Sequence, residues 1–462
     1  MTVKVVVAPM LPSSPFPLVV ALQKRLSEQL QLIRHLSSRS SADVGPFFSL
    51  SKKQRRELEV LDAVALYLDR KGDEDSVAVA IDKDWVAVRF VLAKQITPSA
   101  EDINHAKKFF STISSLQSPL EFLPFALENS SINVRKKISK ISELKMDIVE
   151  KYVEEHQFLK GLHEFTDSIA VGFANQLATQ WSLSSLEPKA LLRRAYIEAK
   201  AMAADIITSD SDITNTTFIA LLQIVYLVVH SHFGSLLIGY DHVTTPKSLE
   251  MGKIRRRFRK LSHYYTGAEQ IHHYRKLVPE GAEISHLWVQ GPEPTTLTLS
   301  PSPIDTASRH FPTLTEELLE RAQSTLVEQW NMTALPVVHP EILILLHFET
   351  IPLINSRHGT IRLIGCNRKC CRCCVQWIQR WNTHGRDCWT TSRRGQFPSR
   401  NWSLTGMSHE EDASVVNQID HIVDEVLERS TGHRLERPEI KLSPFEQRMA
   451  DQLISVAKRF RL

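Results

Sequence analysis

Hydrophobic and polar positions near the start of the chain follow first a helical and then a strand period. Apolar residues recur every three to four positions over residues 58–68, and Gly72 ends the pattern, which predicts an amphipathic helix. Residues 77–81 then alternate β-branched with small side chains, and residues 85–93 form a β-branched and aromatic run. These patterns predict a helix followed by a β-hairpin.

Helical periodicity dominates the middle of the chain. Ser99 or Thr97 can cap a helix there, and a capping box, Thr313 with Glu316, opens another. Periodic segments cover residues 146–169, 186–207 and 313–330, with a loop rich in Pro, Thr and Ser at residues 292–303. We therefore expect residues 98–330 to form a mainly helical block, and residues 1–50 a helical extension.

The last third of the chain returns to an alternating order of helix and strand. A helix with the sequence EILILLHFE opens at Pro340, and a strand, TIRLIG, follows at residues 360–365. The cysteine-rich segment comes next. Two further amphipathic helices are predicted over residues 409–462, the second starting at Ser443 and Pro444. This order is typical of α/β architecture.

The composition is that of a folded, helix-rich chain. Of 462 residues, 42% are hydrophobic, 23% are charged and only 16 are glycine, which argues against a disordered, collagenous or turn-rich all-β protein. The net charge of +4 is too near neutral for a polybasic protein, although it can hide local patches. At about 150 residues per domain, the length allows two or three domains.

The sequence indicates an intracellular protein without a membrane span. The first 23 residues contain four prolines and lack the uninterrupted apolar core of a signal peptide. The uncharged stretch at residues 213–240 contains several polar side chains, so we expect a buried helix there. All six cysteines lie between Cys366 and Cys388, whereas disulfide frameworks spread theirs across the fold. This clustering favours a reducing compartment and a metal site.

A His-Pro-Glu triplet and a doubled cysteine pair supply the ligand types that zinc prefers. His339, Pro340 and Glu341 open a predicted helix, and CCRCC follows the next predicted strand at residues 370–374. One histidine and two cysteines in C-x-x-C spacing make a three-ligand set, and a catalytic zinc keeps its fourth position for water. In such a site the glutamate moves protons. The spacing occurs in two registers, Cys370 with Cys373 and Cys371 with Cys374.

These segments resemble a fungal group of deaminase-like proteins related to a toxin-type deaminase of Orientia, within the zinc-dependent superfamily of nucleotide and nucleic-acid deaminases. The similarity is carried by VVHPEILILLHFE and RLIGCNRKCCRCCVQWI, which supply an H-x-E helix, a strand ending in Ile-Gly-Cys and a helix with C-x-x-C. The resemblance implies that His339, Cys371 and Cys374 hold Zn2+ and that Glu341 is the catalytic proton shuttle. It also selects this cysteine register over the other.

A second stretch, LDAVALYLDRKGDEDSVAVAIDKDWVAVRFVLAK, looks like the start of the same proteins. Their core begins with a helix and a β-hairpin before the H-x-E helix, which implies a core split around the helical insertion at residues 98–330. Residues 51–97 would supply the first helix and hairpin, residues 331–408 the zinc-binding half, and residues 409–462 a helical tail. The implied fold is α/β, with a cytidine deaminase-like three-layer core and helix-rich overall. The hairpin should then share one sheet with the strand at residues 361–364.

The segment around the cysteines is basic and rich in tryptophan. Between Arg362 and Trp402, nine Lys and Arg residues accompany a single acid, with four tryptophans interleaved. Cations with aromatic faces suit a nucleic-acid or nucleotide surface, and buried tryptophans under a solvated face fit the pattern equally. The side chains expected to contact substrate or nucleic acid are Arg372, Trp377, Arg380 and His384. A second run, residues 253–260, has six cations in eight positions, a pattern usual on an exposed helix face and also suited to nucleic-acid contact.

Two functional hypotheses follow. In the first, the chain is a zinc-dependent hydrolase, a deaminase in which water activated by zinc attacks an amidine carbon of a nucleobase, nucleotide or nucleic acid and ammonia leaves. In the second, it is a catalytically inactive, deaminase-like interaction protein with a structural zinc, for which His384, His358 or Cys388 could supply the fourth ligand. His347, on an apolar helix, is expected to be a core residue.

Overall fold

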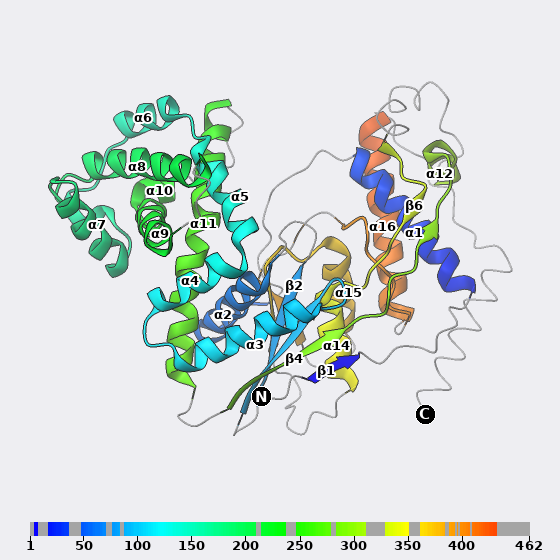
Figure 1. Cartoon of the computed structure of the whole chain (residues 1–462). Coiled ribbons are helices and arrows are strands. Elements are labelled where there is room, and N and C mark those ends of the chain that lie inside the picture. Colours follow the sequence, from blue (N-terminus) through cyan, green and yellow to red (C-terminus); the bar gives the residue numbers. More distant parts are fainter. Residues whose placement is uncertain are drawn as a thin grey trace.

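A mixed six-stranded sheet in the order β1-β4-β3-β2-β7-β8 forms the centre of the fold (Figure 1). The computed structural model describes residues 4–7, 17–36, 48–70, 76–83, 87–208, 214–236, 246–278, 283–310, 329–350, 361–383, 388–392, 395, 398–406 and 409–431. The strands are β1 (Lys4–Val7), β2 (Val77–Lys83), β3 (Ala87–Lys94), β4 (Glu283–Gln290), β7 (Ile361–Cys366) and β8 (Cys388–Thr391). Strand β2 pairs antiparallel with β3 and β7, and the other neighbours are parallel.

Two segments far apart in sequence meet in this sheet. Strand β2, from the predicted hairpin, pairs with β7 through Ala78 opposite Cys366 and Val79 opposite Gly365. The prediction that the hairpin and the strand at residues 361–364 share one sheet is thus confirmed, as are the hairpin itself and the helix before it, α2 (Lys52–Leu68). The chain is a helix-rich α/β protein.

Strand β7 lies directly against helix α2. A Cβ added to Gly365 would come within 2.2–2.4 Å of Leu61 and of the Asp62 backbone nitrogen, so only glycine allows this approach. The Asp62 carboxylate then accepts the Cys366 N–H at 2.8 Å. Helix α2 therefore fixes the position of β7, the strand that leads to the cysteine segment.

Strand β2 buries a different kind of side chain on each face of the sheet. Val77 and Val79 of β2 belong to a core shared with α2, α3 (Ala100–Ser115) and α11 (Pro246–Leu277). Ala78 and Ala80, which alternate with them, belong to a second core with α14 (Pro340–Thr350) and α15 (Arg372–Asn382). Small residues let helices approach a sheet closely. The result is three layers, with the helices of the candidate metal site on the alanine face.

The block expected to be helical is mostly so, and its helices from α4 (Pro119–Asn129) to α11 form the unit at the left of Figure 1, while α3 lies beside the sheet. The helices of the block are α3, α4, α5 (Ser131–Ser142), α6 (Met146–Glu155), α7 (Ser168–Gln180), α8 (Pro188–Thr208), α9 (Asn215–Val229), α10 (His232–Leu236) and α11. The periodic segment at residues 146–169 is not one helix. It breaks after Glu155, where the buried Glu164 carboxylate accepts the N–H groups of Leu159 and Phe233 at 2.9 and 2.6 Å.

Strand β4 is the second departure from the predicted helical block. It lies between β1 and β3, and Trp288 on it is 1% exposed. Parallel pairing with β3 makes it a central strand, a contact that local periodicity does not reveal. The helix predicted over residues 313–330 falls almost wholly outside the described residues, as does the second helix of the C-terminal tail.

Helices near both ends of the chain pack into the core that carries the candidate metal site. The N-terminal extension is not purely helical, because its β-branched start forms β1 on the edge of the sheet beside β4. Helix α1 (Pro17–Leu36) follows and packs on α16 (His409–Thr431), with Arg25 paired to Asp420 at 3.0 Å. Shorter elements near them are β5 (Leu297–Thr298), α12 (Pro303–His310) and β6 (Thr333–Ala334). In the described part of the chain, every helix is too short or too polar to span a bilayer.

Candidate metal centre

The histidine of the H-x-E motif lies immediately before helix α14. Pro340 is the first helical residue, a position where the missing N–H leaves no hydrogen bond unmade. The His339 carbonyl accepts the N–H groups of Ile342 and Leu343 at 3.0 and 3.1 Å, which fixes the histidine at the helix start. His339 and Glu341 are both buried, at 7% and 5% exposure.

The two cysteines of the candidate pair lie on the first turn of α15. Cys371 is the N-cap residue, and its carbonyl accepts the Val375 N–H at 2.9 Å. Cys374 follows three positions later, so both side chains project from one face of the helix. Their sulfur atoms are 3.6 Å apart. A C-x-x-C spacing at a helix start therefore places both thiols together.

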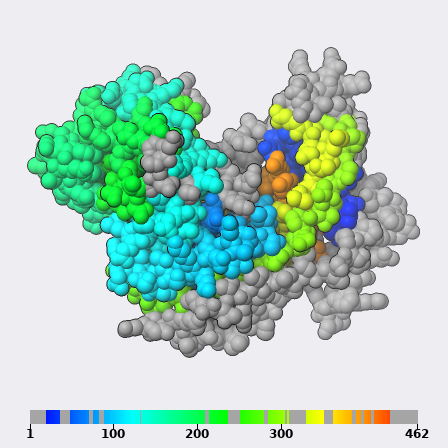
Figure 2. All heavy atoms as spheres, in the orientation of Figure 1, coloured from blue at the N-terminus to red at the C-terminus, as the bar shows by residue number. Residues whose placement is uncertain are grey.

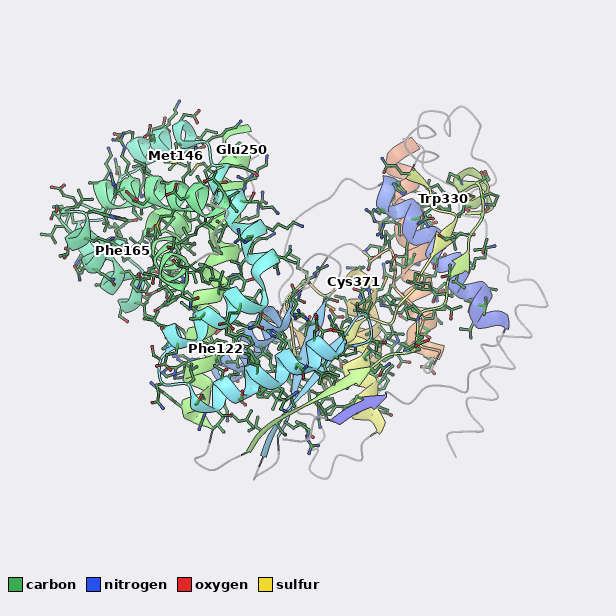
Figure 3. All side chains as sticks on the ribbon, viewed as in Figure 1. Phe122, Met146, Phe165, Glu250, Trp330 and Cys371 are labelled. Atoms are coloured by element: carbon green, nitrogen blue, oxygen red, sulfur yellow. The ribbon has the colours of Figure 1, made fainter. Side chains whose placement is uncertain are left out.

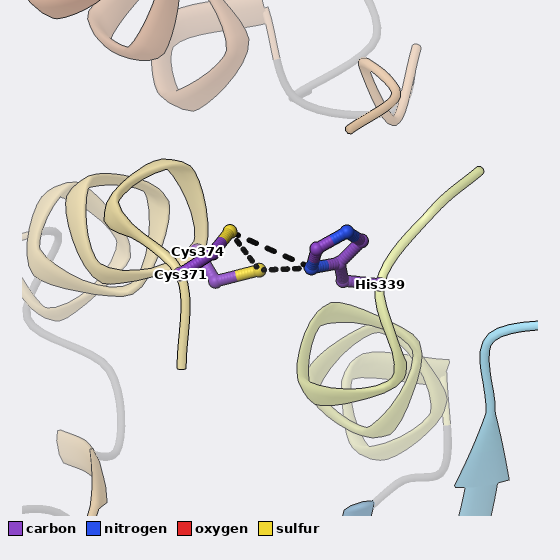
Figure 4. A group of neighbouring side chains, drawn as sticks. All are labelled: His339, Cys371 and Cys374. Carbon is purple, nitrogen blue, oxygen red and sulfur yellow. Dashed lines mark hydrogen bonds between the residues drawn. The ribbon is translucent and has the colours of Figure 1, made fainter. Parts of the chain in front are cut away.

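His339, Cys371 and Cys374 converge on one point (Figure 4). The His339 Nδ1 atom is 3.5 Å from Cys371 Sγ and 3.3 Å from Cys374 Sγ. Tetrahedral zinc, with bonds of about 2.1 Å to nitrogen and about 2.3 Å to sulfur, separates such atoms by about 3.6–3.8 Å. The three donors therefore fit a zinc ion with only small adjustments. Among the described residues, no fourth His, Cys, Asp or Glu joins this group.

The geometry also bears on the cysteine register. The donors that gather around His339 are those of Cys371 and Cys374, and not those of Cys373. Cys370 belongs to a second, overlapping group with Glu341 and Cys374. Cys373 is buried at 1% exposure in the apolar core. The structure thus places Cys371 and Cys374, the pair that the family resemblance selects, around His339.

Glu341 lies beside the three donors. Its Oε2 atom is 3.8 Å from Cys374 Sγ. Burial raises the pKa of Glu341, and the negative charge of Cys371 adds to this effect against the attraction of His339. The Cys366 thiol, also beside Glu341, has a pKa well above its usual value, chiefly because it is buried. A carboxyl group with a raised pKa next to a metal-type donor set is suited to exchanging protons.

The histidine and the cysteines influence one another's protonation. Burial opposes the Cys371 thiolate, but hydrogen bonds from Cys373 and Cys374 and the charge of His339 together hold its pKa well below the usual value. In turn, burial opposes the charged imidazole, but Cys371 and Glu341 raise the pKa of His339 overall. The Cys374 thiol has a raised pKa, mainly from burial. Metal binding requires thiolates and a neutral imidazole, so the centre already favours one thiolate.

A tryptophan that the sequence did not single out as part of the centre touches it directly. The Trp402 indole N–H donates to Cys374 Sγ at 3.3 Å, and Trp402 is fully buried. Its backbone pairs with Val337, two residues before His339. The Gln23 side chain of α1 donates to the Trp402 carbonyl at 3.1 Å and accepts the Leu404 N–H at 2.7 Å. The N-terminal helix thus positions a hydrogen-bond donor on a zinc-ligand candidate.

A buried carboxylate ties the same loop to α15. Asp412 of α16 accepts the Trp377 indole N–H at 3.2 Å and the backbone N–H groups of Thr405 and Gly406 at 3.1 and 2.9 Å. Burial raises its pKa to about 6 against these hydrogen bonds. No local signal in the sequence marks Asp412, because its partners come from two other segments, α15 and the loop at residues 405–406.

The predicted substrate contacts are only partly compatible with the structure. The prediction for Trp377 is wrong, because that side chain is fully buried and its N–H is engaged by Asp412. Trp381, Trp389 and Trp402 are buried as well, which fits the alternative of buried tryptophans. Arg380 is exposed and pairs with Glu410 at 3.3 Å, and Arg372 is half-buried. His384 lies outside the described residues.

Other polar residues of the core and of the cysteine segment lie outside the candidate metal centre. His347 is 2% exposed and lies outside both donor groups, as expected for a core residue. Cys388 starts β8 and also lies outside both groups, while His358 falls outside the described residues. Lys94, at the end of β3, is buried and pairs with Asp102 at 2.9 Å. It is a structural residue in this fold.

The segment that carries this centre is similar to a known deaminase family. A family model described as "OTT_1508_deam:-like deaminase" matches residues 338–404, which include His339, Glu341, both candidate cysteines and Trp402. The matched segment is a small part of the 462-residue chain. No curated protein and no solved structure matches.

Proposed function

We propose that the chain is a zinc-dependent deaminase that acts on a nucleobase-containing substrate. One observation carries the proposal: His339, Cys371 and Cys374 form a zinc-type donor group with Glu341 beside it, inside the segment that resembles a deaminase family. Three protein donors leave a tetrahedral position for water, as in catalytic rather than structural zinc sites. Bound zinc would supply Lewis acidity, lowering the pKa of water toward neutrality.

Glu341 is the proton carrier in this proposal. Overall, a water oxygen replaces the amino group on an amidine carbon: a C–O bond forms, the C–N bond breaks and ammonia leaves. Glu341 takes a proton from the water and delivers it to the leaving nitrogen. Its buried position, 3.8 Å from Cys374 Sγ, and its raised pKa suit a group that must both accept and release a proton near neutral pH.

The surrounding residues support this role. Trp402 donates a hydrogen bond to Cys374, which stabilises a thiolate ligand and fixes its orientation. All six cysteines are free thiols, which is consistent with the proposed intracellular, reducing setting. Placement in the cytidine deaminase-like superfamily is part of the same proposal, and it is supported by the split core around β2, β3 and β7.

Ammonia release tests the proposal. The purified protein, loaded with one zinc per chain, is incubated with nucleosides, nucleotides and single-stranded DNA and RNA. Glu341→Ala is the control, because it removes the carboxylate while the three donors remain. Ammonia from at least one substrate class, lost in Glu341→Ala at equal zinc content, is the expected result. Ammonia release that is unaffected by Glu341→Ala would rule out Glu341 as the proton carrier. A zinc-loaded protein that is inert toward every class would favour the inactive interaction protein.

A further inference from the structure

Cations from two elements of the helical unit and from the cysteine loop form one basic surface. Its members are Lys140 of α5, Arg256 and Lys260 of α11, and Lys369 of the loop before α15, and all four are exposed. The two helices are joined at this point, because the Arg257 side chain donates to the Lys140 carbonyl at 2.7 Å. Part of the sequence run at residues 253–260 therefore lies beside α5.

The charges that act most strongly on Lys260 are positive. Lys140, Arg256 and Lys369 lie close enough that, after burial, their repulsion contributes to lowering the pKa of Lys260. Neither Lys140 nor Lys260 forms an ion pair with any residue that the structure describes. The nearby Glu143 is engaged by Arg257 at 3.8 Å, and Asp69 accepts from Asn133 at 3.1 Å. Lys140 and Lys260 therefore repel each other, and neither has an ion-pair partner of its own among the described residues.

A further lysine lies behind this surface. Lys137, one turn before Lys140 on α5, donates to the Tyr264 hydroxyl at 3.0 Å and lies 4.4 Å above the Tyr264 ring centroid. Burial lowers its pKa to about 8, and the charges of Lys260 and Lys140 add to this effect against the attraction of Asp69. Clustering cations raises the free energy of the protein alone. A polyanion lowers that free energy, and it releases counterions on binding.

The position of the basic surface relates it to the metal centre. Lys369 precedes Cys371 by two residues and is next to Cys370, whose carbonyl accepts the Gly395 N–H at 2.7 Å. In Figure 3, Cys371 lies between the helical unit, labelled at Phe122 and Met146, and the part labelled at Trp330. The surface drawn in Figure 2 is hollowed between these same two parts. A bound polymer that crosses the basic surface toward Lys369 therefore approaches the first turn of α15.

We propose that the basic surface binds the phosphate backbone of a single-stranded nucleic acid, one base of which enters the metal centre. The inference rests on the proposed deaminase function for the fate of that base, but the binding itself does not require catalysis. Four cations spread over three elements match successive phosphates better than one phosphate group. A single strand is favoured because chemistry on a base requires it to be unstacked and unpaired.

Binding of a fluorescent 20-nucleotide single strand, measured by anisotropy against salt concentration, tests the inference. The full-length, zinc-loaded protein is compared with the double variant Lys140→Gln/Lys260→Gln. Binding should weaken about tenfold or more, and the slope of log affinity against log salt should fall by about 1.4, or about 0.7 per lost phosphate contact on a single strand. The charge-preserving variant Lys140→Arg/Lys260→Arg should bind like the wild type, which separates lost charge from lost folding.

A matched control removes the same charge elsewhere. Lys107 on α3 and Lys160, between α6 and the next turn, are also exposed lysines, and Lys107→Gln/Lys160→Gln should leave affinity and salt slope unchanged. Three results would overturn the inference. The two Gln pairs could lose affinity equally, or Lys140→Gln/Lys260→Gln could bind like the wild type. Polyglutamate could also displace the strand as readily as DNA does. Displacement by an equal concentration of mononucleotide would also overturn the inference, because it would indicate a site for one phosphate.

The two proposals fail separately. Strand binding is an equilibrium measurement that needs no turnover, so the wild type and Lys140→Gln/Lys260→Gln can be compared whether or not ammonia is released. Ammonia release from free nucleosides tests the metal centre alone, because a nucleoside has no phosphate, and it should not depend on Lys140 or Lys260. If Lys140→Gln/Lys260→Gln loses strand binding as predicted but the wild type releases no ammonia, the deaminase proposal is wrong and the nucleic-acid binding proposal is retained.

Discussion

The Trp402 indole N–H donates to Cys374 Sγ at 3.3 Å, which links a C-terminal loop to the centre of the donor group. Hydrogen bonds to a ligand atom orient the ligand and tune its affinity for metal, and their loss typically weakens binding about tenfold or more. Trp402→Phe should therefore bind zinc about tenfold more weakly, as measured by competition with a chromophoric chelator. The matched control is Trp389→Phe, because Trp389 is buried but touches Phe348 instead of a cysteine. Equal losses in both variants would assign the effect to packing.

The cysteine register gives a second prediction. Cys371→Ser and Cys374→Ser should each abolish stoichiometric zinc binding, because each removes one of three converging donors. Cys370→Ser and Cys373→Ser should retain about one zinc per chain, measured by elemental analysis after dialysis. The reverse pattern would move the ligand set by one residue and contradict the geometry around His339.

Gly365 tests the split core. Its added Cβ would lie 2.2 Å from the Leu61 carbonyl carbon, so Gly365→Ala must displace β7 from α2. Overpacking of this kind costs about 1–3 kcal/mol, which should appear as a lower midpoint in denaturant unfolding. Gly172→Ala is the control, since nothing lies within 4 Å of its added Cβ on α7. That change should be neutral or stabilise by up to about 1 kcal/mol. Equal midpoints for the two variants would mean that β7 and α2 are not packed as described.

Asp412 predicts a pH dependence. Its pKa in the folded protein is raised to about 6 from 3.8 by burial, so the folded state holds the proton more tightly than the unfolded chain. Lowering the pH from about 7 to about 4 should then add stability to the wild type relative to Asp412→Asn, which cannot take up this proton. Thermal unfolding of both proteins across that range measures the difference. A constant difference at every pH would show that Asp412 titrates normally.

Local pattern predicted the elements that carry the donors, and tertiary contacts decided the rest. The helix at residues 58–68 and the hairpin have clear periodicity, the helix at Pro340 is an apolar run after a proline, and the family resemblance paired these elements. Strand β4 was missed because both its neighbours in the sheet lie far away in sequence and the segment EISHLWVQ mixes polar with apolar residues.

In the candidate site too, some residues could be predicted from local sequence and others depend on tertiary contacts. His339, Glu341 and a C-x-x-C pair follow from spacing, because a helix start determines which side chains lie together. Spacing left two cysteine registers open, and the family resemblance selected Cys371 with Cys374. Trp402 could not be found in this way, since Gln23, 379 residues away, helps to hold its loop. Trp377 was misassigned because interleaved tryptophans and arginines look alike in sequence whether the rings are buried or exposed.

Isotope incorporation tests the central claim most directly. The zinc-loaded protein is incubated in 18O-labelled water with the substrate that yields ammonia, and the product is analysed by mass spectrometry. The account predicts one 18O atom in the product for each ammonia released. It also predicts a rate about 100-fold or more lower for Glu341→Gln, which keeps the side-chain shape and the zinc but cannot carry the proton. Ammonia release without 18O incorporation, or an undiminished rate in zinc-loaded Glu341→Gln, would contradict it.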